Sequence, residues 1–487
     1  MKCVGLIVIT LFLFAHGIVR AAESELLYAI ERNDSDAALV LLEQGADVHV
    51  SHPDGATVLH WTSHWDLVDL TKHLLDAGAP VNAVNDFGVA PISVACRNGS
   101  VSMVDVLLSG GADAQTAEPS GETALMTCAR TGSKESVEQL LADGAYPNAF
   151  EVSSGQTALM WAAAGGHTAT ARALLEAGAE IDARSKGEFT PLMFAARAGA
   201  IQAAELLLEA GATFNMATPE GLSPLLIAAA SIDAITGSDY RLVVETSDHE
   251  ALGILLLEYG ANVGQADQYG MTSLHYAVEM RKPMLLEALL EHGADPNTQL
   301  IDGLPFRRGD YVGREAYNGA SPFWLAARLG DVEMMRALLA AGADPELRSA
   351  YGVTPLMVAA GLTQTDSRMV AEDRLLEAVE MLTLDVGADI YAVDRSGQTA
   401  VHGAANVSGN ALIQFLVDQG ADPMAEDKRG QTPLDVATRT LRPRPRTAAT
   451  SFNIAAMVGF LEVSARPKIA RRMGIPLLAR ACICRQN

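Results

Sequence analysis

Histidines are the residues of this chain with the most potential for chemistry, because the common catalytic motifs are missing from the sequence. It contains no phosphate-binding glycine-rich loop, no Gly-x-Ser-x-Gly nucleophile turn and no His-Glu-x-x-His zinc motif. His60 and His64 have the i,i+4 spacing of metal ligands on a helix. No carboxylate completes that pattern, so we expect no metal, no other cofactor and no enzymatic activity.

A recurring tetrapeptide of the type Thr-Pro-Leu-Met indicates which elements must position these residues. Its copies begin at Thr57, Ala90, Thr123, Thr157, Thr190, Ser223, Thr272, Ser321, Thr354, Thr399 and Thr432. Successive starts are 33 or 34 residues apart, except for two intervals of 49 and one of 45. In the regular copies a Gly-Ala pair follows the start by 21 residues, and Ser24 stands at the same distance before Gly45. We therefore count twelve copies.

Each copy is predicted to form two helices and a turn. Thr or Ser caps the first helix, and proline fits its first turn. Segments such as residues 137–145 place apolar residues at helical spacing and end in a Gly-Ala pair, whose glycine ends the helix. The pattern resembles the ankyrin repeat, Thr-Pro-Leu-His-x-Ala with a period of 33 residues. The resemblance implies an all-α fold over residues 22–464, a solenoid of stacked helix pairs with projecting β-hairpin or turn fingers.

Two of the five cysteines, Cys96 and Cys128, lie on the inner helices of adjacent copies, where the motif expects alanine. Stacked helices are about 8–10 Å apart, whereas a disulfide needs Cα atoms within roughly 7 Å. We therefore expect both to be buried small residues without a disulfide. Cys482 and Cys484 form a Cys-x-Cys pair, for which a metal, a strained disulfide and a cross-link of the tail stay open.

Residues 1–21 have the features of a secretory signal peptide. Lys2 precedes an apolar run, and residues 19–21 place small residues for cleavage. We therefore expect an exported protein, periplasmic or secreted, whose mature chain begins at or near Ala22. A membrane anchor is the alternative.

The charge of the chain is unevenly distributed. Residues 439–487 contain ten Lys or Arg residues and one acidic residue, so they carry +9, and the total of −24 leaves −33 for residues 1–438. An acidic body argues against nucleic acid as a partner. Residues 465–487 form a basic, partly apolar tail, for which contact with an anionic membrane and contact with the acidic solenoid both stay open.

Three insertions interrupt the repeats, near residues 231–248, 298–318 and 362–373. The first and third separate the two helices of a copy, and the second enlarges a hairpin. The enlarged hairpin contains arginine and aromatic residues, the types favoured at protein interfaces: Phe306, Arg307, Arg308, Tyr311, Arg314 and Tyr317. Neutral loop growth is the alternative explanation.

The resemblance implies that partners bind at the hairpin tips and at the exposed end of each inner helix, seven residues after the motif begins. Five of these positions hold arginine: Arg97, Arg130, Arg197, Arg328 and Arg439. The arginine fork matches carboxylates, so a row of arginines favours an acidic partner. Ordinary ankyrin use of Ala-Ala-Arg-x-Gly is the alternative. Trp65, beside His64, adds an exposed aromatic patch near the N-terminus.

The sequence therefore predicts an exported, monomeric, non-enzymatic solenoid that binds another protein. The binding surface is expected to be the concave face, together with the enlarged hairpin at residues 298–318. The alternative is an enzyme or small-ligand-binding protein whose site is built by the three insertions over repeats six to nine. A pocket with converging ionisable groups beneath the insertions would favour that alternative, and an open face would favour protein binding.

Overall fold

The computed structural model describes residues 25–231, 246–302, 317–364 and 370–439. The chain divides into two compact units, Met1–Pro219 (unit 1) and Glu220–Asn487 (unit 2). The described part of each unit consists of helix pairs, so the predicted all-α fold is confirmed. Instead of strands, the hairpins in the described ranges contain isolated bridges, such as the bridge between Ser51 and Thr57.

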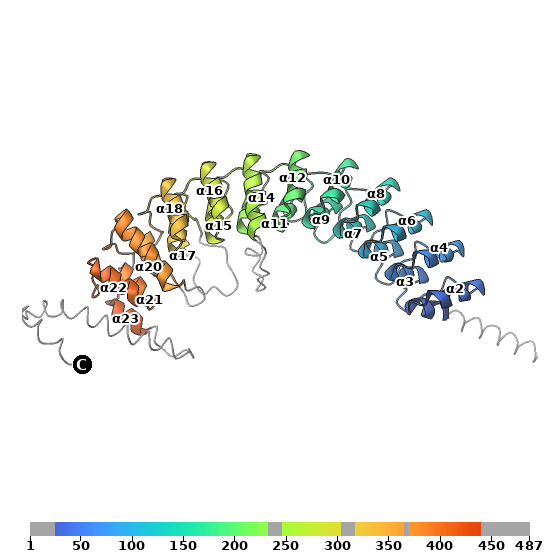
Figure 1. Ribbon diagram of the computed structural model, residues 1–487, viewed down its shortest axis with the longest axis horizontal. Coiled ribbons are helices and arrows are strands. Elements are labelled where there is room, and N and C mark those ends of the chain that lie inside the picture. Colours follow the sequence, from blue (N-terminus) through green and yellow to red (C-terminus); the bar gives the residue numbers. More distant parts are fainter. Residues whose placement is uncertain (1–24, 232–245, 303–316, 365–369, 440–487) are drawn as a thin grey trace, which may run out of the picture. The chain divides into compact units, whose positions relative to one another are not determined.

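Unit 1 is a stack in which short inner helices alternate with outer helices along the chain (Figure 1). Residues 25–31 form the first inner helix. The later inner helices are α3 (Val58–Trp65), α5 (Pro91–Asn98), α7 (Ala124–Thr131), α9 (Ala158–Ala164) and α11 (Pro191–Ala198). The outer helices are α2 (Ser35–Glu43), α4 (Val68–Asp76), α6 (Val101–Ser109), α8 (Lys134–Ala142), α10 (Thr168–Glu176) and α12 (Ile201–Glu209).

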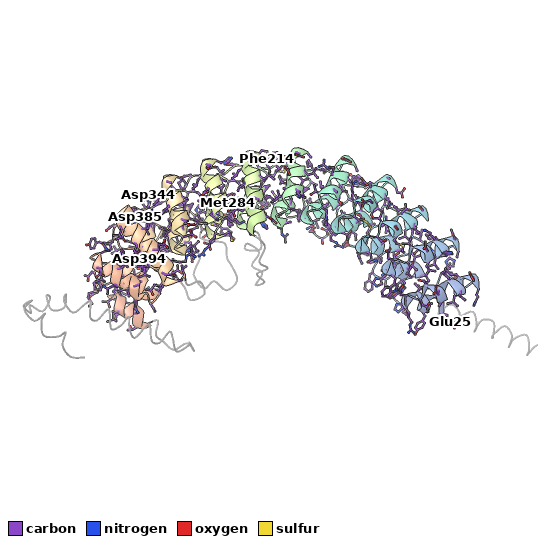
Figure 2. All side chains as sticks on the ribbon, in the orientation of Figure 1. Glu25, Phe214, Met284, Asp344, Asp385 and Asp394 are labelled. Atoms are coloured by element: carbon purple, nitrogen blue, oxygen red, sulfur yellow. A yellow bond between two sulfur atoms is a disulfide. The ribbon has the colours of Figure 1, made fainter. Side chains whose placement is uncertain are left out.

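Unit 2 repeats this arrangement. Its inner helices are α13 (Pro224–Ala230), α15 (Ser273–Glu279), α17 (Pro322–Leu329), α19 (Pro355–Ala359), α21 (Ala400–Asn406) and α23 (Pro433–Arg439). Its outer helices are α14 (Thr246–Glu258), α16 (Pro283–Glu291), α18 (Val332–Ala340), α20 (Glu372–Glu380), which continues into the π-helix η3 (Met381–Val386), and α22 (Asn410–Asp418). On its outer helices, Arg336 of α18 pairs with Asp385 of η3 at 2.9 Å; Figure 2 labels Asp385.

The first residue of the motif stands at the N-cap of the inner helices, and in three copies a histidine three residues later bonds back to it. His60 Nδ1 accepts a hydrogen bond from the amide of Thr57 at 3.0 Å, and its Nε2 donates to the carbonyl of Val89 in the following repeat at 2.8 Å. His275 and His402 occupy the same position in capping boxes of their own. These three histidines therefore have structural roles. Both ring nitrogens of His60 are already hydrogen-bonded, so neither is available to bind a metal together with His64.

The inner helices approach one another closely because small residues face the neighbouring repeat. The Cα atoms of Cys96 and Cys128 are 4.6 Å apart, and the two residues form a disulfide between α5 and α7. The expectation of two unbridged cysteines was therefore wrong. It used the distance between helix axes, but each helix has a Cα radius of about 2.3 Å, so facing Cα atoms lie much closer than the axes do.

Consecutive hairpins are joined by backbone hydrogen bonds, except where the donor position holds proline, as at Pro119 and Pro219 in unit 1. The amide of Asp86 donates to the carbonyl of Asp54 in the preceding hairpin at 2.8 Å. Pro119 occupies the corresponding donor position in the next hairpin and has no N–H. Its ring instead packs on Gly88, where an added Cβ would be 2.3 Å from Pro119 Cδ and φ is +75°. This contact between repeats fixes the backbone beside Glu118.

Several predicted features lie wholly or mainly outside the described residues. They are the signal peptide at residues 1–21, the centres of the three insertions, and the basic tail at residues 465–487. Within the described ranges, no helix is both long enough and apolar enough to cross a membrane.

The buried histidines predict a loss of stability in mild acid. Burial lowers the pKa of His275 to about 4, and it also lowers the pKa values of His60 and His402. Between the unfolded value near 6.5 and the folded value, the unfolded state binds more protons, so the free energy of unfolding falls as pH falls. For His275 alone the loss between pH 7 and pH 5 is roughly 2 kcal/mol.

Urea unfolding of the full chain across this pH range measures the effect. The variant His275→Gln should be less stable than the wild type at neutral pH and should lose part of the pH dependence. The exposed His64 provides a matched control, since His64→Gln should leave the dependence unchanged. Equal pH dependence in the wild type and His275→Gln would contradict the assignment.

Candidate protein-interaction surface

The inner-helix ends of unit 1 carry the side chains that the repeat position predicted to be exposed. All five are exposed: His64, Arg97, Arg130, Ala164 and Arg197. The following repeat holds the helix ends in place. Asn98 Nδ2 donates to the carbonyl of His64 at 2.9 Å, and His167 Nε2 bonds the carbonyl of Arg130 at 3.0 Å. Because these bonds satisfy open carbonyls at the helix C-termini, they fix the point from which each exposed side chain extends.

Two of the predicted arginines form ion pairs with glutamates of the adjacent hairpin. Arg97 pairs with Glu118, and Arg130 Nη2 lies 3.2 Å from Glu122 Oε1. The arginine side chains keep 40% and 51% of their exposure, whereas the glutamates keep only 13% and 17%. The sequence prediction missed both glutamates. The sequence did contain one indication of this pairing: Glu118 stands 21 residues after Arg97, in the turn that reaches the end of the same inner helix.

Arg130 also contacts an aromatic ring, so it joins a continuous row of interacting side chains. Its guanidinium lies 4.7 Å from the centre of the Trp161 ring. The indole is held in turn, because Trp161 Nε1 donates to Gln156 Oε1 at 2.7 Å. A guanidinium over an indole face is a favourable cation–π arrangement.

The carboxyl of Glu118 is in an unfavourable environment for a charge. Burial raises the pKa of Glu118, and the neighbouring Glu122 raises it further, while Arg97 and Arg130 act in the opposite direction. The net direction is upward. The surrounding arginines therefore do not fully compensate the loss of water around this carboxylate.

Trp65 is exposed, as expected, and belongs to an aromatic patch at the start of unit 1. Its side chain is 41% exposed, and Nε1 donates to the carbonyl of Glu31 at 3.2 Å. The ring of His64 lies edge-on to Trp65 at 4.7 Å and to Trp61 at 6.0 Å. The predicted patch is therefore present, and partner binding by Trp65 stays a prediction.

We call the surface formed by Trp65, Arg97, Glu118, Glu122, Arg130, Trp161 and Arg197 the unit 1 face. It combines exposed arginine forks with aromatic rings, the side-chain types that carry most binding energy at protein interfaces. The arginines can bind carboxylates, and the indole rings can bury apolar or cationic groups.

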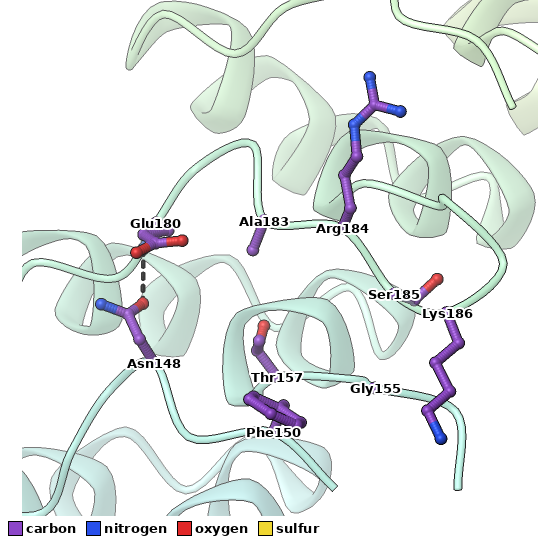
Figure 3. Close-up of a pocket in the computed structure, with 9 residues that line it drawn as sticks. All are labelled: Asn148, Phe150, Gly155, Thr157, Glu180, Ala183, Arg184, Ser185 and Lys186. Carbon is purple, nitrogen blue, oxygen red and sulfur yellow. Dashed lines mark hydrogen bonds between the residues drawn. The ribbon is translucent and has the colours of Figure 1, made fainter. Parts of the chain in front are cut away.

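A pocket of about 360 Å³ lies between two neighbouring hairpins of unit 1 (Figure 3). Two of its polar lining groups already have partners: Asn148 Oδ1 accepts from the amide of Glu180 at 2.7 Å, and Lys186 Nζ donates to the carbonyl of Val152 at 2.6 Å. The Phe150 side chain, 63% exposed, supplies an open apolar wall. The pocket therefore suits an apolar group better than an ion. An aromatic residue in a hairpin is a signal that the sequence prediction did not use.

In unit 2, the structure contradicts the expected exposure of Arg328 and of Tyr317. Arg328 is 3% exposed because its guanidinium pairs with Glu279 at 2.6 Å and lies 5.4 Å from the centre of the Tyr317 ring. Gln364 Nε2 donates to the carbonyl of Arg328 at 2.6 Å, and Tyr317 is itself 7% exposed. Both predicted binding residues are thus packed into the repeat stack.

A second buried cation lies in the preceding repeat, at the start of α16. Lys282 is fully buried, and its Nζ donates to the carbonyl of Ala228 at 2.6 Å and to Ser231 Oγ at 2.9 Å. Burial lowers its pKa to about 8, while Glu250 acts in the opposite direction. The sequence prediction missed this residue. Since it bonds the end of the preceding inner helix, it links two repeats.

Phe306, Arg307, Arg308, Tyr311 and Arg314 lie outside the described residues, so their predicted role stays a prediction. Within the described ranges, no group of three or more His, Cys, Asp or Glu residues is arranged to hold a metal ion.

Comparison with known proteins matches the repeats. The family model "Ankyrin repeats (3 copies)" matches residues 26–118, 59–151, 110–185, 147–218 and 242–299, and the model "Ankyrin repeat" matches residues 318–350.

Three curated relatives align with parts of the chain. The B-cell lymphoma 3 protein homolog of Mus musculus is 34% identical over 119 residues, which are 24% of this chain and 23% of that protein. Protein PhlB of Serratia liquefaciens is 35% identical over 139 residues, 28% of this chain and 49% of that protein. Ankyrin repeat and SOCS box protein 6 of Homo sapiens is 29% identical over 147 residues, 30% of each chain. The alignments thus span half or less of each relative.

The contrast between buried and exposed arginine pairs predicts unequal effects on stability. Arg328→Met leaves the Glu279 carboxylate buried without its partner and should lower the free energy of unfolding by about 3–5 kcal/mol. Arg130→Met removes an exposed pair and should cost less than about 1 kcal/mol. Urea unfolding monitored by circular dichroism compares the two variants. A similar small loss in both would show that the Arg328–Glu279 pair is not a strong link between repeats.

Proposed function

The chain belongs to the ankyrin-repeat family, and on that premise we propose that it is an exported, non-enzymatic scaffold that binds an acidic segment of another protein. Ankyrin repeats mediate protein–protein interaction in general, and solenoids of this kind present extended binding surfaces. The proposed binding surface is the unit 1 face, with the enlarged hairpin at residues 298–318 as a second contact.

The observation that carries the proposal is the row of side chains from Arg97 to Trp161. The two exposed guanidiniums come from consecutive repeats, and both are held by neighbouring side chains. Side chains that are already ordered lose little entropy on binding. The row therefore provides arginine forks that are prepared for the carboxylates of a partner.

The acidic body supports selectivity for this surface. With −33 over residues 1–438, the surface as a whole repels an acidic partner. An acidic segment is therefore directed to the few places where arginines are exposed. Arg197 is exposed at the equivalent position at the end of α11, two repeats after Arg130.

Export is supported by two independent features. Residues 1–21 have the pattern of a signal peptide. The disulfide between Cys96 and Cys128 is of a kind that persists in oxidising compartments and is rare in reducing ones.

The alternative, a catalytic or small-ligand site beneath the insertions, is less well supported. Ionisable groups do converge in unit 2, where Arg281 interacts electrostatically with Arg374, Asp331, Glu279 and Arg328. Four of these groups already form two ion pairs, Arg328 with Glu279 and Arg374 with Asp331. These ion pairs connect one repeat to the next, so they support the stack of repeats rather than a ligand site.

The export proposal predicts two features of protein purified from the exported fraction. N-terminal sequencing should find a chain that begins at or near Ala22. Proteolysis without reductant should release a linked pair of peptides containing Cys96 and Cys128. An intact Met1 in a membrane pellet would identify an anchor instead, and free thiols at both cysteines would contradict the disulfide.

The binding proposal predicts that an acidic peptide binds through the unit 1 arginines. A capped octaglutamate peptide, titrated calorimetrically into the full chain, should bind about tenfold more weakly to the double variant Arg97→Ala with Arg130→Ala, because two charge-assisted contacts are lost. Replacing Arg307, Arg308, Tyr311 and Arg314 together by Ala should also weaken binding if the enlarged hairpin contributes.

Arg172 provides the matched control, because it is an exposed arginine on the outer helix α10. Arg172→Ala removes the same charge from a different surface and should leave binding unchanged. An equal loss in the control and in the double variant would reduce the effect to net charge and would count against a defined site.

A further inference from the structure

Arginines at one repeat position have two different environments in this chain. In unit 2, Arg328 and its partner Glu279 are 3% and 7% exposed. In unit 1, Arg97 and Arg130 are 40% and 51% exposed, although each also has a glutamate partner. The same type of ion pair is thus sealed in one unit and open to solvent in the other.

The two unit 1 glutamates reach the arginines from fixed positions. Glu118 stands beside Pro119, whose ring packs on the preceding hairpin. Glu122 immediately precedes the helix cap Thr123 and accepts a hydrogen bond from Thr127 Oγ1 at 2.9 Å. The carboxylates therefore belong to the scaffold and occupy the arginine forks before any partner arrives.

We propose that Glu118 and Glu122 act as built-in competitors, which a partner must displace from Arg97 and Arg130 with carboxylates of its own. This inference rests on the proposed function, since it concerns the same surface and the same class of partner. It makes Glu118 and Glu122 residues that determine specificity.

The exposed pairs are weak enough to be exchanged. Water screens an ion pair at the surface, and two long side chains lose entropy when they are held together. Glu118 is further disfavoured as a charge, because burial and Glu122 together raise its pKa. A partner carboxylate that takes over the Arg97 fork therefore replaces a poorly stabilised interaction.

Internal competition also sets a requirement on the partner. The scaffold holds its own carboxylates at high effective concentration, so a single incoming carboxylate competes poorly. Two carboxylates on one segment can displace both glutamates together, provided that they span adjacent repeats, roughly 10 Å apart. The surface therefore selects a segment with spaced multiple acidic residues over an isolated acidic side chain.

The variant Glu118→Gln tests the inference, because it removes the charge and keeps the shape. The probe is the capped octaglutamate peptide, titrated into the full-length chain at fixed ionic strength. Glu118→Gln should bind the peptide roughly threefold more tightly than the wild type, since a fork is freed. The gain should disappear when Arg97 is also replaced by Ala, because no fork then remains to be freed.

Glu205→Gln is the matched control, because Glu205 is an exposed glutamate on the outer helix α12. It measures the effect of one negative charge fewer on the acidic body and should leave binding unchanged. Thermal unfolding of every variant checks that the repeats remain folded; if Arg97→Ala unfolds the stack, Arg97→Gln takes its place.

The outcomes separate the inference from the proposed function. If the double arginine variant binds the peptide as the wild type does, both are wrong. If that variant binds more weakly but Glu118→Gln does not bind more tightly, the proposed function stands and internal competition is wrong. A gain that is equal in Glu205→Gln, or that persists without Arg97, also overturns the inference.

Discussion

Close approach of the inner helices is the constraint on which the rest of this structure depends. The 4.6 Å between the Cα atoms of Cys96 and Cys128 is possible only because small side chains face each other there. At this spacing one helix cannot slide along the other without steric clashes. Each repeat is therefore held in a fixed register relative to its neighbour. Equivalent positions of successive repeats therefore align, and the residue seven after each motif start becomes part of a row rather than an isolated side chain.

The polar ends of the inner helices complete this arrangement. Carbonyls at a helix C-terminus need donors, and here the next repeat often supplies them through a side chain: Asn98, His167, Gln364 and Asn406 all donate in this way. Lys282 does the same with a charged group. These bonds connect only neighbouring repeats, so a change at one of them is expected to act locally. Binding residues can consequently vary in one unit without disturbing the fold of the other.

The sequence predicted the features that depend on a few consecutive residues. It missed the features that depend on contacts with other parts of the fold. Caps such as Thr123, the inner helices and the exposure of Arg97 and Arg130 follow from a motif of a few residues, and they were predicted. The disulfide was missed because a typical axis spacing does not describe facing small residues. The burial of Arg328 was missed because Tyr317 and Gln364 reach it from other parts of the fold, and a position within one repeat does not encode its neighbours. Glu118 and Glu122 were visible in the sequence, but their pairing with arginines depends on the hairpin geometry that Pro119 and Gly88 set.

Under the proposed function, the different environments of the arginines let one repeat position serve stability in unit 2 and recognition in unit 1. A guanidinium sealed against a carboxylate must retain that partner, because removing either leaves a buried charge. A guanidinium that stays half exposed can exchange its partner, because water solvates the guanidinium during the exchange. What separates Arg328 from Arg97 is therefore the cover supplied by neighbouring side chains, above all the Tyr317 ring beside the guanidinium. Under the proposed function, the absence of such cover at the same repeat position is what makes the ion pair of Arg97 exchangeable, whereas the cover over Arg328 keeps its pair structural.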